Sequence, residues 1–341
     1  MIELVAHSES MREALRLAGR VAETDANVLV TGESGAGKDA LALFIHALSR
    51  RANNSFVNID CAALPGELLE AELFGYERGA FTGATATKPG RLEAAHRGTL
   101  VLDEIAHLSI DAQAKLLRVI ERREFERLGG RRTVKVDARL VALTNVDLED
   151  AVKRRAFRED LFYRLNVVRI HVPPLRERRE DLRPLASKFL ETYAAKHGRR
   201  ASRFSADALE VLDQYDFPGN VRELSNMVER AVIVSEGGEV SASHLPEAVR
   251  EAARLRSRGS RRPTLAELEA DYIRETLLST RGNKSEAARL LGISRKNLYE
   301  RLAREGAEVG GQESEVRGRR SEVSQKNADD APSQEDSETN L

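Results

Sequence analysis

The sequence predicts an α/β domain built on a parallel sheet, followed by two smaller helical units. Two observations predict the α/β domain: short apolar runs rich in β-branched residues recur through the first half, and amphipathic helical stretches separate them. A third observation marks its end, because "PPL" at 173–175 breaks the alternation and only helical periodicity follows. Continuous apolar strands joined by helices indicate a parallel sheet with helices on both faces.

Five strands are expected in chain order: "NVLVT" (27–31), "FVNID" (56–60), "TLVLDE" (99–104), "ARLVALTN" (138–145) and "NVVRIHV" (166–172). Helical periodicity then continues to about residue 247, with a turn at "FPGN" (217–220). The sequence therefore divides into an α/β part (1–172), a helical part (173–247), an arginine-rich linker (248–263), a second helical unit (264–305) and an acidic tail (306–341).

Charge and composition bound the function. The 341 residues carry a formal net charge of −1, but 281–304 hold seven bases against two acids, and 306–341 hold nine acids against four bases. The basic unit is therefore a candidate for nucleic acid, and the tail, which lacks aromatic residues, is expected to be disordered. Neither a membrane-spanning helix nor a signal peptide is expected from the sequence, and the one cysteine, Cys61, suits a reducing cytoplasm.

A glycine-rich loop, "TGESGAGKD" (31–39), follows the first strand and precedes a helical run. Strand, glycine loop and helix form the context of a phosphate-binding loop, because its backbone N–H groups can turn toward phosphate oxygens at the positive end of the helix. Lys38 would reach the β- and γ-phosphates of a nucleotide. An ordinary tight turn is the alternative. The expected nucleotide-binding residues of this loop are Gly32, Glu33, Ser34, Gly35, Ala36, Gly37, Lys38 and Asp39.

Two carboxylates, Asp103 and Glu104, end the third strand, at the sheet edge where parallel sheets hold ligands. We expect Asp103 to hold a magnesium ion, directly or through water, and Glu104 to orient and deprotonate the attacking water. The alternative is a solvated turn. The glycine-rich loop and the pair of carboxylates together predict that the protein hydrolyses a nucleotide.

The motifs "GESGAGKD", "ELFGYERGAFTGA", "RGTLVLDE", "FREDLFYRLNVVRIHVPPLRER" and "FPGNVREL" occur in this order. They closely resemble the sigma-54-interacting ATPase domain of bacterial enhancer-binding proteins, which belong to the AAA+ superfamily. The last unit resembles their Fis-type helix-turn-helix. The resemblance covers residues 1 to about 305 and implies a AAA+ P-loop NTPase with an α-helical lid and a C-terminal all-α DNA-binding domain.

The resemblance also assigns roles. It makes "GAFTGA" the tip of a surface loop that contacts sigma-54, with Phe81 and Thr82 making the contact; packing of Phe81 into the core is the alternative. The full tip is Gly79, Ala80, Phe81, Thr82, Gly83 and Ala84. Flanking glycines would let the loop be raised or folded down.

Further roles concern the nucleotide. The resemblance makes Thr144 and Asn145 the sensor of the γ-phosphate, and Arg222 the lid-domain sensor arginine. Arg158 and Arg164 occupy the positions of arginine fingers that act on the neighbouring subunit's site. Surface pairing with Glu159 or Asp160 is the alternative for these two arginines.

Three positions depart from common patterns. Asp39 replaces the hydroxyl residue of general phosphate loops, although the family commonly has an acid there. Asp60 stands where many members have an asparagine that restrains the glutamate, and a carboxylate cannot donate a hydrogen bond to Glu104 unless one of the two is protonated. Phe217 replaces a tryptophan, a change expected to be structural only.

The basic unit reads as two helices joined at Gly292, with Ser294 able to cap the second. The start of a recognition helix enters the major groove. The expected DNA-binding residues are Lys284, Ser294, Arg295, Lys296, Asn297 and Arg301. A protein-binding helical hairpin is the alternative. The preceding segment from Thr264 to Leu278, with Leu265, Leu268, Ile273 and Leu277, is expected to pair two subunits.

The resemblance implies a cytoplasmic transcription activator that binds enhancer DNA and assembles from dimers into a ring, expected to be a hexamer. It would use ATP and magnesium to remodel the closed complex of sigma-54 RNA polymerase. An ATPase-independent DNA-binding regulator and a AAA+ remodeller of another partner are the alternatives. Because the ATPase part begins almost at Met1, either constitutive activity or control by a separate regulatory protein is expected.

Overall fold

The computed structural model describes residues 4–200, 203–235, 238–260, 265–280 and 282–302. The chain divides into two compact units, Met1–Leu255 and Arg256–Leu341, and each is described by itself. Among the described residues, no helix combines the length and the apolar character needed to cross a membrane. The tail, 306–341, lies outside the described residues.

The first unit is built on a five-stranded parallel sheet in the order β2-β5-β8-β1-β9, as the sequence predicts. Its strands are β1 (Val28–Thr31), β2 (Phe56–Asp60), β5 (Thr99–Asp103), β8 (Arg139–Thr144) and β9 (Val168–His171). The three central strands β5, β8 and β1 are almost wholly buried, which explains their continuous apolar character. Parallel pairing brings their carboxyl ends to one edge.

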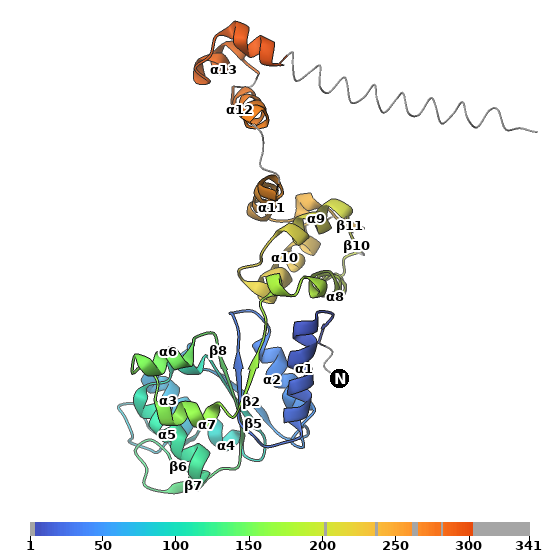
Figure 1. Cartoon of the computed structure of the whole chain (residues 1–341). Helices are drawn as coiled ribbons and strands as arrows, with labels where there is room; N and C mark the ends of the chain where they lie inside the picture. Colours follow the sequence, from blue (N-terminus) through green and yellow to red (C-terminus); the bar gives the residue numbers. More distant parts are fainter. Residues whose placement is uncertain (1–3, 201–202, 236–237, 261–264, 281, 303–341) are drawn as a thin grey trace, which may run out of the picture. The chain divides into compact units, whose positions relative to one another are not determined.

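Helices cover both faces of this sheet (Figure 1). The helices α1 (Glu9–Ala22) and α2 (Lys38–Ala47) share a core with Val28 and Val30, whereas Leu29 points into the opposite core. That core is covered by α3 (Gly66–Phe74), α4 (Arg91–Ala94), α5 (Ile110–Arg122), α6 (Leu148–Lys153) and α7 (Glu159–Leu165). The alternation of side chains along a strand thus serves two cores.

Two short antiparallel pairs project from the second set of helices. Strands β3 (Gly75–Tyr76) and β4 (Lys88–Pro89) flank the "GAFTGA" loop, and β6 (Glu124–Glu126) pairs with β7 (Thr133–Lys135) in a hairpin. An isolated bridge joins Tyr76 to Leu128 in the hairpin turn. The "GAFTGA" loop and the β6–β7 hairpin are therefore joined at the base of the loop.

The helical part contains η2 (Leu175–Glu177), α8 (Arg179–His197), α9 (Ala206–Gln214), α10 (Asn220–Val234), η3 (Ala242–His244) and α11 (Glu247–Ser260), with a small pair β10 (Arg203–Phe204) and β11 (Glu239–Val240). Phe217 is fully buried in its core, in line with the structural role expected for it. The sequence predicts a linker at 248–263, but the structure shows helix α11 as far as Ser260. Val249 and Ala253 are buried one helical turn apart, and this burial stabilises the helix.

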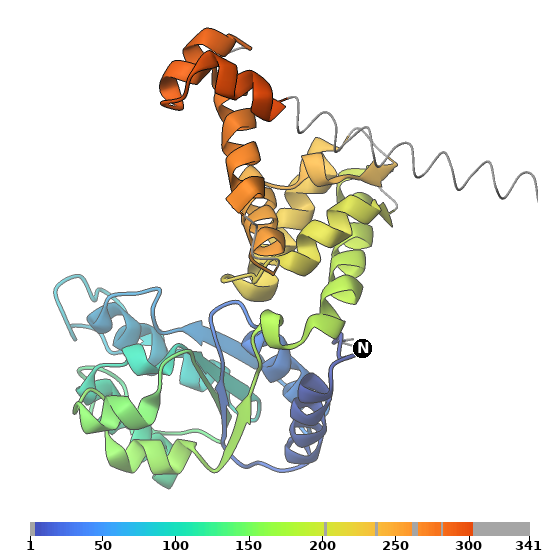
Figure 2. The same ribbon diagram turned by 45° about the horizontal axis from the view of Figure 1, so that its top comes forward.

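The second unit holds α12 (Leu265–Ser279), α13 (Lys284–Leu290) and a helix over 295–302 (Figure 2). Ile273, Ala287, Ala288 and Leu298 form its buried core. Ile273 and Leu277, which are expected to pair two subunits, pack in the unit's own core, where Ile273 is buried and Leu277 partly buried. Thr264 and the side chains of Leu265, Leu268 and Leu278 lie outside the described residues.

Candidate functional site

The glycine loop lies between β1 and α2, as the sequence predicts. Gly35 (φ +73°) and Gly37 (φ +103°) take left-handed conformations, and a Cβ on Gly35 would come 2.4 Å from the carbonyl oxygen of Gly219. Lys38 is only 6% exposed, and its Nζ donates to the carbonyl oxygens of Gly32 (3.0 Å) and Glu33 (3.2 Å). The loop backbone thus holds the ammonium group inside the loop.

The acid pair lies beside this lysine. Glu104 Oε1 is 3.6 Å from Lys38 Nζ, and Glu104 Oε2 accepts a 3.1 Å hydrogen bond from the backbone N of Asn145. Burial, and then the charges of Asp39 and Glu104, raise the pKa of Asp103 to about 6. Glu104 itself has φ +51°, an uncommon value for a residue other than glycine. The carboxyl edge of the sheet therefore holds crowded negative charge facing one buried cation.

Asp60 lies in register opposite Asp103, and its carboxylate accepts a 2.8 Å hydrogen bond from the backbone N of Ala62. Glu104 is bound instead by Lys38 and Asn145. An asparagine is nevertheless present nearby, because Asn58 lies two residues before Asp60 and so on the same face of β2. Its side-chain amide donates a 3.2 Å hydrogen bond to Asp39 Oδ1. Sequence reasoning missed Asn58, although its position two residues before Asp60 could have revealed it.

The nucleotide-loop residues and the acids line one cavity together with side chains from the helical part. Arg222 Nη1 donates 3.1 Å to Ser34 Oγ, and the backbone N of Val221 donates 3.0 Å to the carbonyl of Gly35. Phe189 and Ser225, which sequence reasoning missed, come from α8 and α10. The lining residues are Ser34, Gly35, Gly37, Lys38, Asp39, Ala40, Asp103, Glu104, Phe189, Val221, Arg222 and Ser225.

Glu33 and Ala36, both expected to bind nucleotide, contact the helical part. The Glu33 carboxylate accepts hydrogen bonds from Arg176 (2.6 and 2.8 Å) and Asn220 (3.0 Å), and these partners, Arg176 first, lower its pKa to about 2. The Ala36 carbonyl accepts from the buried Arg178. Neither side chain lines the cavity. Both residues therefore join the loop to the lid.

Thr144 and Asn145 lie at the end of β8, beside the loop. The carbonyl of Thr144 accepts a 3.2 Å hydrogen bond from the N of Gly32, and its hydroxyl is engaged with the backbone of Val146. Asn145 is exposed, and its backbone N holds Glu104. The structure therefore connects the expected sensor to the acid pair through the backbone.

The two arginines expected to act on a neighbouring subunit do not line the chain's own cavity. Arg158 forms an ion pair with Asp160 (2.7 Å), and Arg164 forms one with Glu121 (3.1 Å). Both side chains are exposed, at 38% and 61%. Exposed pairs of this kind contribute about 0 to 1 kcal/mol, so either arginine can leave its partner at small cost.

The "GAFTGA" loop is exposed at its tip. Phe81 is 43% exposed and packs edge-on against Tyr76, with ring centroids 5.0 Å apart, so it is not part of the core. Thr82 is exposed, whereas Ala84 is 6% exposed, and the N of Gly79 donates 2.9 Å to its carbonyl. Ala84 therefore closes the loop, and contact through its side chain is not supported.

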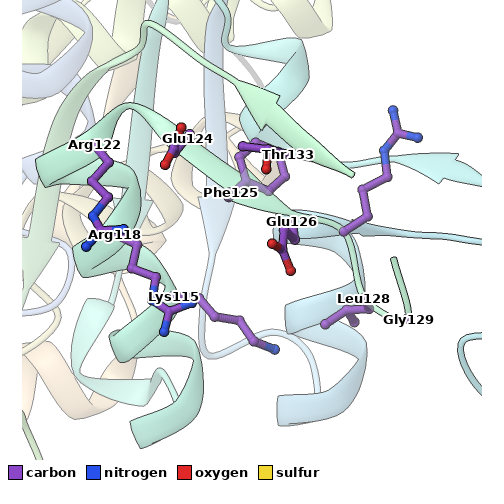
Figure 3. A pocket seen from close by; sticks show the side chains of 10 residues that line it. Lys115, Arg118, Arg122, Glu124, Phe125, Glu126, Leu128, Gly129 and Thr133 are labelled. Carbon is purple, nitrogen blue, oxygen red and sulfur yellow. The ribbon is translucent and has the colours of Figure 1, made fainter. Parts of the chain in front are cut away.

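The base of the loop is bound to the hairpin. Arg127 forms ion pairs with Glu77 (2.8 Å) and Glu93 (2.7 Å), and Thr87 Oγ1 donates 2.7 Å to Glu77. A cavity next to this network lies between α5 and the hairpin (Figure 3). Lys115, Arg118 and Arg122 line it opposite Glu124 and Glu126, and Lys115 already pairs with Glu70 at 2.8 Å. It is separate from the nucleotide cavity and we assign it no ligand.

In the second unit, Ser294 caps the helix 295–302, because its Oγ accepts a 3.2 Å hydrogen bond from the N of Asn297, and Gly292 has φ +67° at the turn. Arg295, Lys296 and Asn297 are exposed at the start of this helix. The other two predicted DNA-binding residues are engaged: Lys284 Nζ lies 4.9 Å from the centre of the Tyr299 ring, and Arg301 pairs with Glu269.

A magnesium ion fits the donor set, although no cluster of three or more metal-ligating side chains occurs among the residues that the structure describes. Burial raises the pKa of Asp103, and so does repulsion from Asp39 and Glu104, which a cation would relieve. Magnesium is commonly bound by one or two carboxylates together with substrate phosphates. Asp103 and Asp39 would hold the ion here, and it would neutralise charge on the phosphates.

The fold and this cavity define a P-loop NTPase of the AAA+ type that carries a helix-turn-helix. Three protein families match the chain in order: the Sigma-54 interaction domain at residues 4–171, the AAA+ ATPase lid domain at 176–261, and the bacterial regulatory protein, Fis family, at 264–304.

Whole proteins match as well. The regulatory protein AtoC of Escherichia coli is 43% identical over 311 residues, which are 89% of this chain and 68% of AtoC. The transcriptional regulatory protein ZraR of Klebsiella oxytoca is 47% identical over 304 residues, which are 88% and 68% of the two chains. A crystal structure of NtrX from Brucella abortus in complex with ATP has a TM-score of 0.68 at 36% identity, over 89% of this chain and 70% of NtrX.

The chain therefore belongs to the sigma-54-dependent transcriptional regulators, AAA+ ATPases with a C-terminal Fis-type DNA-binding domain. This membership confirms the family and the fold that the motifs indicate.

Proposed function

We propose that this chain is an activator that binds enhancer DNA, assembles into a ring and couples ATP hydrolysis to remodelling of the sigma-54 RNA polymerase closed complex. One observation carries the proposal: the same domain presents a cavity lined by the glycine loop, a buried lysine and an acid pair, and an exposed aromatic ring on a loop. The groups for hydrolysis and for contact with a partner thus occur in one domain.

ATP is the proposed substrate. Its phosphates would lie on the loop backbone and Lys38, while Arg222 from the lid would approach from the other side of the cavity. Lys38 would leave Glu104 when phosphate replaces that carboxylate as its partner. Glu104, still held by the backbone of Asn145, would then orient and deprotonate the attacking water. Magnesium, when bound by Asp103, would supply charge neutralisation.

The positions of Arg158 and Arg164 support the proposal that the chain forms an oligomer. Neither reaches the chain's own cavity, and both have weak exposed partners. We propose that they complete the site of a neighbouring copy, where a guanidinium would stabilise charge on the transferring phosphoryl group. A lone chain would then hydrolyse ATP slowly, and a ring such as a hexamer would be the active form. A separate regulatory protein is a possible partner of that assembly.

The test is ATP-dependent open-complex formation by sigma-54 RNA polymerase on a promoter premelted beside the start site, with Thr82→Ala as the variant and ATPase rates matched. The proposal predicts opening by the intact chain, and hydrolysis without opening by the variant. Arg78→Ala, an exposed change just outside the loop, is the matched control and should still open the promoter. Hydrolysis by the intact chain without opening would favour a remodeller of another partner, and DNA binding without hydrolysis would favour an ATPase-independent regulator.

A further inference from the structure

The acidity of the segment 306–341, which lies outside the three matched family segments, is concentrated at one end. Residues 306–326 hold four acids and four bases, so they are neutral overall. Residues 327–341 hold five acids and no base. The acids of this terminal block are Asp329, Asp330, Glu335, Asp336 and Glu338. It is therefore a distinct polyanionic block.

The helix-turn-helix offers a complementary surface in the same unit. Arg289, Arg295 and Lys296 are exposed, and no ion pair involving them is found among the described residues. Arg301, about one and a half helical turns farther along, already pairs with the carboxylate of Glu269. The recognition helix therefore accepts a carboxylate of its own chain at one position, and its more exposed bases lie at the end proposed to enter DNA.

The length of the connecting chain permits the contact. Twenty-four residues, 303–326, separate the last described residue of the helix from the acidic block, and they can span up to roughly 80 Å. The helix 295–302 is only about 12 Å long. A tether of this length gives an effective concentration on the order of millimolar, so even a weak electrostatic contact would be populated.

We propose that the acidic block 327–341 docks on the basic face of the helix-turn-helix of the same chain and competes with DNA for it. The inference rests on the proposed DNA binding of that face. The block acts as a mimic of the phosphate backbone, because both present closely spaced negative charges to Arg295 and Lys296. Binding to arbitrary DNA is suppressed, whereas a target site that adds base contacts displaces the block.

The first measurement is the affinity of the full chain for a short duplex of arbitrary sequence as a function of salt. Neutralising the block (Asp329→Asn, Asp330→Asn, Glu335→Gln, Asp336→Asn and Glu338→Gln) should raise affinity on the order of tenfold at about 50 mM salt, as expected if about a tenth of the intact chains have a free face. The gain should vanish at high salt, because the docking contact is itself screened.

A matched control changes the same number of uncharged residues in the block to alanine: Asn327, Ser333, Gln334, Ser337 and Asn340. This variant should bind like the intact chain. Equal affinity of the neutralised variant and the intact chain at low salt would overturn the proposal.

The second measurement does not depend on DNA. A carbodiimide joins a lysine amine to a carboxylate in contact, so the intact chain without DNA should give a cross-link between Lys296 or Lys284 and the block. Lys296→Arg, which keeps the charge but removes the amine, should lose the Lys296 product. Cross-links confined to other lysines would overturn the docking even if DNA binding holds. If neither form binds DNA but the cross-link forms, docking stands and the proposed DNA binding fails.

Discussion

Asp181, at the start of α8, ties the first helix of the ATPase part to the lid. Its carboxylate is fully buried and accepts hydrogen bonds from the backbone N of His7 and Ser8 and from Ser8 Oγ, the last at 2.8 Å. Ser8 is also the N-cap of α1. The positively charged neighbour is Arg178, which is 3% exposed and donates to the carbonyl of Ala36 in the glycine loop.

Replacing this group tests the junction. Asp181→Ala leaves buried donors without an acceptor, at about 1 to 3 kcal/mol each, and leaves the Arg178 charge without its neighbour. These costs are not additive, and we expect a loss of about 3 to 5 kcal/mol in the free energy of unfolding. Asp181→Asn, which keeps one acceptor oxygen, should lose less.

The assay is urea unfolding followed by circular dichroism, with the shift in midpoint read at an unchanged slope. Glu180→Gln is the matched control, because Glu180 is exposed in the same helical turn, and it should change stability by less than about 0.5 kcal/mol. A loss below about 1 kcal/mol for Asp181→Ala would refute the reasoning that this carboxylate holds the first helix and the lid together.

Three further predictions follow. The pKa of Glu33 is about 2 in the folded chain and 4.5 in isolation, so its contacts stabilise the fold above about pH 4.5 and are lost as pH falls toward 2. Glu33→Gln should remove this pH dependence. Because the side chain is 42% exposed, the substitution should lower the free energy of unfolding at pH 7 by only about 0.5 to 1 kcal/mol, measured by denaturation. Burial, and then the charge of Asp60, raises the pKa of the Cys61 thiol to about 12, so at pH 8 iodoacetamide should label the native chain roughly a thousandfold more slowly than the urea-unfolded chain, and a difference within tenfold would contradict its burial. Tyr76→Leu removes a ring contact with Phe81 that is worth about 0.5 to 1.5 kcal/mol. In a chain that also carries Phe81→Trp, this change should increase acrylamide quenching of the indole fluorescence. Unchanged quenching would show that Tyr76 does not hold the ring.

Local sequence patterns were sufficient to predict the sheet and the glycine-rich loop. Continuous apolar strands report burial on both faces, and Gly35 and Gly37 report backbone that other residues avoid. The helix α11 could also be predicted, since Val249 and Ala253 have helical spacing, but the six arginines in 250–262 suggested a linker. Charged residues on the outer face of a helix do not oppose its formation.

Long-range partners were not readable from the sequence. Glu33 lies inside the phosphate-loop motif, yet its side chain binds Arg176, 143 residues away, and the motif gives no sign of this partner. Asp181 and Arg178 lie in a charged stretch that resembles a solvated turn until α1 covers them. The roles of Arg158 and Arg164 depend on a second copy, so a single chain shows only their exposed ion pairs.

If ATP hydrolysis is coupled to contact with sigma-54, as we propose, the state of the nucleotide site should determine whether the exposed loop binds sigma-54. The most direct measurement is binding of purified sigma-54 to a Glu104→Gln variant, which should hold ATP without hydrolysing it, in the presence of ATP or ADP. The account predicts a complex with ATP that is lost with ADP and lost again when Phe81→Ala is added. Binding that is the same with both nucleotides, or that survives Phe81→Ala, would contradict it.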